Sequence, residues 1–187
     1  MSPEKMHADE IDTDVSLVGQ LLAAQFPQWA HLPLERVPSS GTDNALYRLG
    51  GGMVVRLPRI DGAIGGVGKD FRWLPILAPL LPRSIPVPLA KGTPAAGYPW
   101  EWGAYPWLEG ENPTVDGFAD ADSLAKDVAQ FVEVLHRVDL AGGPPAGRGA
   151  PLAMRDDPTR TAIAALRGMI DTLAVTDAWD AALRTPA

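Results

Sequence analysis

The chain has 187 residues, of which 46% are hydrophobic and 21% charged, a composition typical of a folded protein with one or two domains. Its formal net charge of -7 disfavours non-specific binding to nucleic acid or anionic lipid, because both need a basic surface. With no cysteine, the chain cannot form disulfides, thiolate metal sites or a cysteine nucleophile. The N-terminal residues lack the apolar stretch of a signal peptide and no later segment approaches a membrane-spanning length. We therefore expect a cytoplasmic protein with no membrane or nucleic-acid partner.

The N-terminal part of the chain predicts one helix followed by three strands. Asp14 can cap a helix whose apolar residues recur at helical spacing, and Pro27 ends it. Beyond this helix the apolar pattern shortens to strand-like runs, separated by turn residues and by three consecutive glycines. We expect antiparallel strands at Leu34–Val37, Ala45–Leu49 and Met53–Leu57.

A second helix and two more strands are predicted next. The helix covers Val67–Leu77, although Pro75 would end or kink it, because proline lacks the N–H that a helix interior needs. Strands follow within Ile85–Gly92 and Trp100–Leu108, with a turn between them at Pro94–Gly97. Five strands and the inserted helix would make a compact small lobe.

The most regular helical pattern of the chain lies behind a connector at Glu109–Pro113. It predicts a helix over Ser123–Arg137, with Asp122 as the expected N-cap. The helix carries one apolar stripe, which consists of Leu124, Val128, Phe131, Val132 and Leu135. A stripe of this kind needs a cover, so we expect the chain to self-associate through this helical face if its own later helices leave the stripe bare.

Further helices are expected to begin at Asp157, which Pro158 follows, and to surround Trp179. The predicted fold class is therefore α+β. We expect a first domain at residues 1–108, made of the N-terminal helix and the small lobe, and a second, helical domain at residues 109–187.

The small lobe contains a pattern that can hold phosphate groups. A turn of small and polar residues, Ser40, Gly41, Thr42, Asp43 and Asn44, precedes two strands, and the later strand carries one cation, Arg56. Turn amides and a strand cation face the triphosphate in kinases. On these residues alone, an ordinary β-meander with one exposed arginine is the favoured interpretation, because short strand patterns are permissive.

A longer run of segments resembles the first half of the aminoglycoside phosphotransferase family, in the same order and over nearly the whole chain. The agreement of these segments with the predicted strands and helix favours a protein-kinase-like small lobe, followed by the first helices of an incomplete large lobe. The segments are Gly41–Leu49, Val54–Arg59, Arg72–Pro75, Ile85–Pro88 and Trp107–Glu111.

The resemblance implies a nucleotide site. ATP or GTP, with Mg²⁺, would place its phosphates under the Ser40–Asn44 turn and against Arg56, which Asp70 on the next helix would orient. The backbone around Tyr105, Trp107 and Leu108 would bind the nucleotide base, with Leu46 and Val54 as apolar walls. For the side chains of Tyr105 and Trp107, core packing is the preferred interpretation, since the contact with the base is a backbone one. For Asp70, a place on a solvated helix face remains an open alternative.

The family's catalytic segments are absent from these 187 residues. The sequence contains neither a His-Gly-Asp loop nor an Asp-Phe-Gly-like segment, so no catalytic residue and no metal ligand can be assigned. We expect a kinase of a small hydroxylated acceptor by ancestry, inactive as this chain alone. A non-catalytic nucleotide-binding or regulatory module, or an unrelated α+β interaction protein, are the alternatives.

Overall fold

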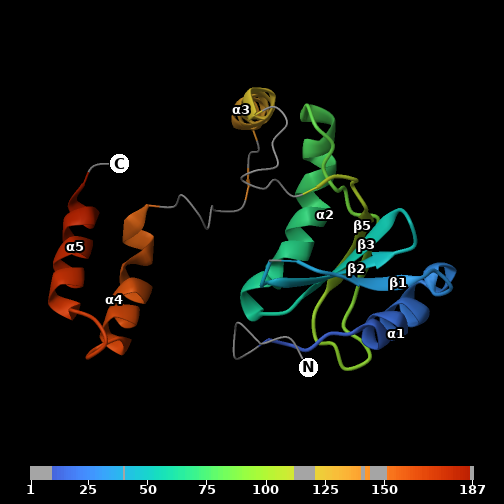
Figure 1. Cartoon of the computed structure of the whole chain (residues 1–187), viewed down its shortest axis with the longest axis horizontal. Coiled ribbons are helices and arrows are strands. Elements are labelled where there is room, and N and C mark those ends of the chain that lie inside the picture. The colour runs from blue at the N-terminus through green and yellow to red at the C-terminus, as the bar shows by residue number, and fades with distance from the viewer. Residues whose placement is uncertain (1–9, 40, 112–120, 140–141, 144–150, 186–187) are drawn as a thin grey trace. The chain divides into compact units, whose positions relative to one another are not determined.

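The structure is a computed structural model, and it describes residues 10–39, 41–111, 121–139, 142–143 and 151–185. The chain forms two compact units, Met1–Asp139 and Leu140–Ala187 (Figure 1). The first unit holds the sheet and the second holds a pair of helices. The α+β fold class predicted from the sequence is confirmed.

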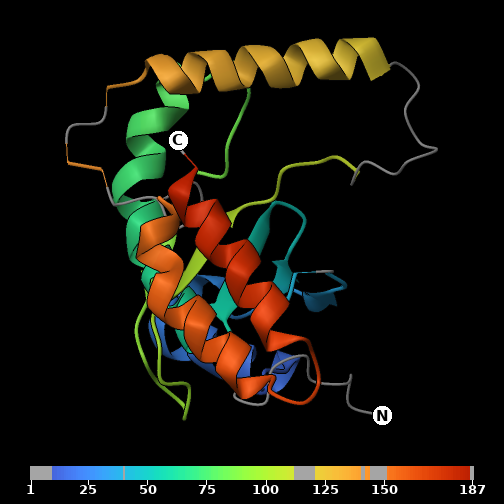
Figure 2. The same ribbon diagram turned by 90° about the vertical axis from the view of Figure 1, so that its left-hand side faces the viewer.

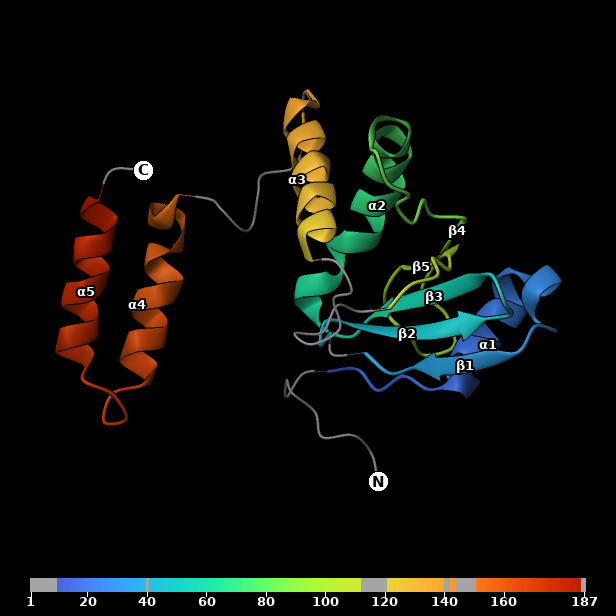
Figure 3. The same cartoon turned by 45° about the horizontal axis from the view of Figure 1, so that its top comes forward.

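The sheet has five strands in the order β1-β2-β3-β5-β4, and every neighbouring pair is antiparallel (Figure 3). The last strand in the chain, β5, therefore lies inside the sheet, next to β3. Alternating apolar residues and the glycine turn after β2 explain why these segments pair as strands. The strands are β1 (Leu34–Val37), β2 (Asn44–Leu49), β3 (Met53–Pro58), β4 (Ala90–Gly92) and β5 (Trp102–Pro106).

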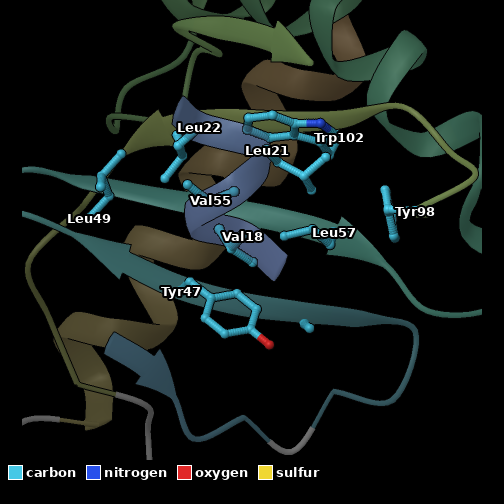
Figure 4. Close-up of a cluster of buried hydrophobic side chains, with 10 residues drawn as sticks. Val18, Leu21, Leu22, Tyr47, Leu49, Val55, Leu57, Tyr98 and Trp102 are labelled. Carbon is cyan, nitrogen blue, oxygen red and sulfur yellow. The ribbon is translucent and has the colours of Figure 1, made fainter. Parts of the chain in front are cut away.

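Helix α1 (Val15–Gln25) covers one face of the sheet. Asp14 caps it as predicted, because its carboxylate accepts a hydrogen bond from the Leu17 N–H at 2.7 Å. Figure 4 shows apolar side chains of this helix directed at strand residues, forming a core with almost no solvent exposure. The buried residues of this core are Val18, Leu21, Leu22, Ala45, Tyr47, Leu49, Val55, Leu57, Tyr98 and Trp102.

The opposite face of the sheet carries the residues of the predicted phosphate site. Successive strand side chains point to opposite faces, so Arg56 points away from its buried neighbours Val55 and Leu57. In register with Arg56 are Leu46 on β2 and Gly103 on β5. This side is the one that α2 (Gly65–Leu77) approaches, as its contact with Arg56 shows. We call it the α2-facing side.

Two elements have a different length in the structure from the length predicted from the sequence. The strand expected over Ile85–Gly92 is reduced to β4, because Pro86 and Pro88 have no N–H to donate to a ladder. Helix α2 passes through Pro75 and ends two residues later, where a 3-10 turn replaces it. The short 3-10 helices are Pro27–Trp29, Asp61–Ala63, Ala78–Leu80 and Leu152–Arg155.

The remaining helices are α3 (Ala121–Arg137), α4 (Asp156–Ala165) and α5 (Thr172–Arg184), and the last two lie side by side (Figures 1 and 2). Asp122 lies in the first turn of α3, so its predicted role as the N-cap is wrong. Asp171 caps α5 by accepting a hydrogen bond from the Ala174 N–H. Within the described part of the chain, no helix is both long enough and apolar enough to cross a membrane.

Candidate functional site

Arg56 and Asp70 form an ion pair on the α2-facing side of the sheet. Arg56 lies in the middle of β3 and Asp70 in the second turn of α2, and the arginine Nη2 contacts Asp70 Oδ2. The prediction that these two residues approach one another is confirmed. Strand β3 leads into α2 through one short turn, so the chain brings the two side chains together locally.

The pair is only partly shielded from solvent. The side chains of Arg56 and Asp70 are 27% and 20% exposed, so each keeps some contact with solvent while Asp70 holds the Arg56 guanidinium through Nη2. The Arg56 Nε is buried, and no described residue accepts a hydrogen bond from it. A partly exposed guanidinium can bind an anion, because its donors suit the spacing of phosphate oxygens.

The turn before β2 is organised by its own side chains. The Gly41 N–H donates to the Ser39 hydroxyl at 3.0 Å, and the Thr42 hydroxyl donates to the Asp43 carboxylate at 3.0 Å. Asn44 is already the first residue of β2 and pairs with the end of β3. Ser40, which the sequence places in the same site, lies outside the described residues.

A second ion pair, which was not predicted from the sequence, lies next to the same turn. Arg59 donates its backbone N–H to the Asp43 carbonyl at 2.8 Å, while its guanidinium contacts the Glu10 carboxylate. The Arg59 and Glu10 side chains are 15% and 1% exposed, so this ion pair is more buried than the pair of Arg56 and Asp70. The Ile11 N–H donates to the Arg59 carbonyl at 2.8 Å. The segment before α1 therefore holds the end of β3 in place.

The segment expected to bind a nucleotide base follows β5. Pro106 has no N–H, and the Trp107 N–H donates to the Gly52 carbonyl at 2.8 Å. The backbone donor of Trp107 is therefore occupied within the protein. Among the described residues, nothing accepts a hydrogen bond from the Leu108 N–H, so Leu108 is the first backbone donor after β5 that a base could reach.

The Trp107 side chain takes part in a second cluster that the sequence did not indicate. The guanidinium of Arg48 lies over the Trp107 ring, 4.4 Å from its centroid, and pairs with Glu109 at 3.0 Å. The indole Nε1 of Trp107 is buried without a partner in the described part of the chain. The preference for a packing role of this side chain agrees with these contacts.

Tyr105 contributes a polar contact rather than packing alone. Its hydroxyl donates to Asp70 Oδ2 at 2.9 Å, and the Arg56 guanidinium lies 5.0 Å from its ring centroid. Burial raises the pKa of Tyr105, and the neighbouring Asp70 adds to the rise, so the hydroxyl stays protonated and able to donate. The hydrogen bond could have been anticipated only from the register of β5 against β3, which places Tyr105 on the same face as Arg56.

The residues described do not form a Mg²⁺ site. No group of three or more histidine or acidic side chains lies together in residues 10–39, 41–111, 121–139, 142–143 and 151–185. Asp70, the carboxylate at the centre of the site, is already bound by Arg56 and Tyr105. We therefore assign no chemical step to a metal ion held by these residues.

A five-stranded antiparallel sheet with a cation on its third strand, paired to a carboxylate on the next helix, is the small-lobe arrangement of protein kinases. Comparison with known proteins gives the family. The model of the phosphotransferase enzyme family matches residues 35–187, and the chain belongs to this family. A search of curated proteins finds no match.

Three solved structures with the same fold are phosphotransferases by name. The GDP and kanamycin complex of APH(2")-IIia has a TM-score of 0.70 and 19% identity, over 90% of this chain and 59% of that chain. ADP-bound APH(2'')-Ib has a TM-score of 0.59 and 17% identity, over 84% and 53%. The macrolide 2'-phosphotransferase MphH from Brachybacterium faecium has a TM-score of 0.51 and 26% identity, over 80% and 54%.

The sequence identities and the coverage determine what these similarities show. The identities of 17% and 19% establish the fold alone. The chain spans between 53% and 59% of the length of the three solved proteins. It is therefore comparable with part of each protein.

Proposed function

We propose that this chain binds the phosphate groups of ATP or GTP on the α2-facing side of its sheet. Arg56 would supply the cation and Asp70 would orient it, while the turn residues Gly41, Thr42, Asp43 and Asn44 would lie over the phosphates. The observation that carries the proposal is the partly exposed Arg56–Asp70 pair at the third strand. Related folds bound to GDP and ADP support it.

The nucleoside part would lie along the same side of the sheet. Leu46 is in register with Arg56, and Val54 lies two residues before it, so both apolar side chains share its face. They would contact the base, and the Leu108 N–H would donate to its edge. Discrimination between ATP and GTP would depend on that edge, since the phosphates are common to both nucleotides.

Binding of the phosphates is tested by Arg56→Ala. We expect the variant to lose at least about tenfold in affinity for ATP or GTP, measured by calorimetry, with little change for the corresponding nucleoside. Lys91→Ala is the matched control, because Lys91 is also a strand cation paired with a carboxylate, Glu101, at 2.9 Å. Equal triphosphate affinity in Arg56→Ala and in the unaltered chain would contradict the proposal.

Phosphate transfer to a small hydroxylated acceptor would be the reaction of the family. The 187 residues contain neither the His-Gly-Asp nor the Asp-Phe-Gly-like segment that would orient the acceptor and hold Mg²⁺. We therefore expect the chain alone to bind nucleotide without transferring phosphate. This behaviour would be shared by a piece of a kinase and by a non-catalytic binding module.

The absence of transfer can be measured directly. The purified chain would be incubated with ATP or GTP, Mg²⁺ and kanamycin, and the aminoglycoside then analysed by mass spectrometry. Unmodified kanamycin is the expected result. Phosphorylated kanamycin that forms with the unaltered chain and not with Arg56→Ala would show that the residues present suffice for catalysis.

A further inference from the structure

One oxygen of Asp70 accepts two hydrogen bonds from different elements. Arg56 Nη2 on β3 and the Tyr105 hydroxyl on β5 both contact Oδ2, the latter at 2.9 Å. Tyr105 is 3% exposed, so its hydroxyl is removed from water and has Asp70 as its partner. Since a buried hydroxyl without a partner is costly, this contact is a fixed feature of the folded lobe.

The ring of Tyr105 also contacts the two residues that its hydroxyl connects. The Arg56 guanidinium lies 5.0 Å from the ring centroid, and Phe71, the residue after Asp70, packs its ring 6.5 Å away in an edge orientation. One face of the aromatic ring therefore supports the cation while its hydroxyl holds the carboxylate. Arg56 and Asp70 are constrained by a third residue and not only by each other.

Gly103 leaves the space that this ring occupies. A Cβ atom at residue 103 would lie 2.6 Å from the Tyr105 Cε2 and 2.7 Å from its hydroxyl oxygen. Both distances are far below van der Waals contact. Gly103 is also the β5 residue in register with Arg56, so the ring lies over the strand directly beside the cation. Any side chain at residue 103 would displace the ring from Arg56 and Asp70.

A two-residue ion pair at this exposure would be weakly ordered. Asp70 is short and on a helix, Arg56 is long and on a strand, and their side chains are 20% and 27% exposed. Partly exposed pairs of this kind gain little energy and lose side-chain entropy when they are ordered. A second, buried donor fixes the carboxylate before the arginine binds it, which reduces that loss.

We propose that Tyr105 is a positioning residue of the phosphate site, which acts through Asp70 to hold Arg56 in the orientation that binds phosphate. The proposal rests on the proposed nucleotide function and names a residue that supports it without touching the nucleotide through its side chain. Gly103 belongs to the same arrangement, because it admits the ring.

The test compares Tyr105→Phe with Tyr98→Phe. Both remove one buried hydroxyl, but the Tyr98 hydroxyl donates to the Pro58 carbonyl at 2.7 Å and has no contact with Asp70. We expect Tyr105→Phe to lower triphosphate affinity about tenfold and to leave nucleoside affinity unchanged, because only the cation is misplaced. Tyr98→Phe is expected to change neither affinity by more than about twofold, whatever it does to the melting temperature.

Asp70→Glu provides a rescue. Glutamate is one methylene longer, so it can reach Arg56 without being held by Tyr105. We expect the double variant Tyr105→Phe with Asp70→Glu to recover triphosphate affinity to within about threefold of the unaltered chain, a non-additive result that a merely structural role of the hydroxyl would not produce.

A nucleotide-free measurement separates this inference from the proposed function. The buried Arg56 Nε–H should give a slowly exchanging NMR signal, assigned with Arg56→Lys, whose exchange accelerates in Tyr105→Phe and not in Tyr98→Phe. If the unaltered chain binds triphosphate and Arg56→Ala does not, equal affinities and equal exchange in Tyr105→Phe overturn the positioning role alone. If the unaltered chain binds no triphosphate, the proposed function is wrong and the phosphate role of Tyr105 is wrong with it.

Discussion

Helices α1 and α3 show how differently two apolar helix faces are used in this chain. Helix α1 buries Val18, Leu21 and Leu22 against the sheet, with at most 2% of each exposed. Helix α3 has the more regular apolar stripe, yet none of its described residues is buried and Leu124 remains 39% exposed. An apolar stripe marks a surface that can be covered, while burial depends on a partner of matching shape in the same chain.

The largest difference in stability is expected between alanine substitutions of a leucine in α1 and a leucine in α3. Leu21→Ala should destabilise the small lobe, which is the sheet with α1 and α2, by about 2–5 kcal/mol, because it opens a cavity in a fully buried core. Leu124→Ala removes the same atoms from α3 and should stay within about 0.5 kcal/mol. Denaturant unfolding followed by tryptophan fluorescence measures both. Equal losses would mean that α3 is packed as tightly as α1.

A smaller difference in stability is expected between substitutions of a buried glutamate and an exposed one. Glu10→Gln should cost about 2 kcal/mol, because it leaves Arg59 without its charged partner in a largely buried place. Glu133→Gln breaks the pair with Arg137 on α3, where both side chains are more than half exposed, and should cost less than about 0.5 kcal/mol. The same unfolding experiment in high salt should leave the first difference largely intact. If high salt abolished the stability loss of Glu10→Gln, the Glu10 carboxylate would have to be exposed to solvent.

Alkaline pH should destabilise the small lobe and have no such effect on α3, α4 and α5. All three tyrosines lie there, and burial raises the pKa of Tyr98 and Tyr105 above the ordinary value of 10.0. Above pH 10 the unfolded chain has released these protons while the folded chain keeps them, so the free energy of unfolding falls as pH rises, by up to about 1.4 kcal/mol per pH unit for each tyrosine. Below pH 10 this contribution is constant.

Phenylalanine variants check the cause of that slope. The double variant of Tyr98→Phe and Tyr105→Phe should flatten the dependence between about pH 10 and 11, measured by denaturant titration at each pH. Helices α3, α4 and α5 contain no tyrosine, so the flattening is expected only for the unfolding transition of the small lobe. An unaltered slope in the double variant would contradict the assignment of the pH effect to Tyr98 and Tyr105.

The smallest effect on stability is expected at the α3 stripe, where the readout is association instead. Val132 is 40% exposed, so Val132→Lys should leave the unfolding free energy of the small lobe unchanged. We expect the unaltered chain to self-associate through the stripe and the variant to do so less, as measured by light scattering and by binding of a hydrophobic dye. A monodisperse monomer with weak dye binding before any substitution would contradict the expectation.

Much of the small lobe could be predicted from the sequence because its signals are local. The cap at Asp14, the alternation in β2 and β3, and the glycine turn between them each involve neighbouring residues. The approach of Arg56 to Asp70 is expected from the family resemblance, and the short connection between β3 and α2 makes it possible. Local patterns therefore suffice for α1 and the paired strands, but not for the central ion pair.

The contacts that escaped prediction depend on pairings between distant segments. Tyr105 meets Asp70 only because β5 lies inside the sheet against β3, and the chain order of the strands does not reveal this. Likewise, Glu10 reaches Arg59 across the whole of α1 and three strands. In contrast, the shortening of β4 could have been anticipated, because Pro86 and Pro88 already rule out a regular ladder in that segment.

The hydrogen bond between the Trp107 N–H and the Gly52 carbonyl extends the rigid part of the chain beyond the end of β5. Arg48 lengthens it again by holding both the Trp107 ring and the Glu109 carboxylate. The next residue, Gly110, has a φ of 155°, a backbone conformation that side-chain-bearing residues rarely adopt. A residue with a side chain at position 110 would therefore strain the backbone directly after the segment that Gly52 and Arg48 hold.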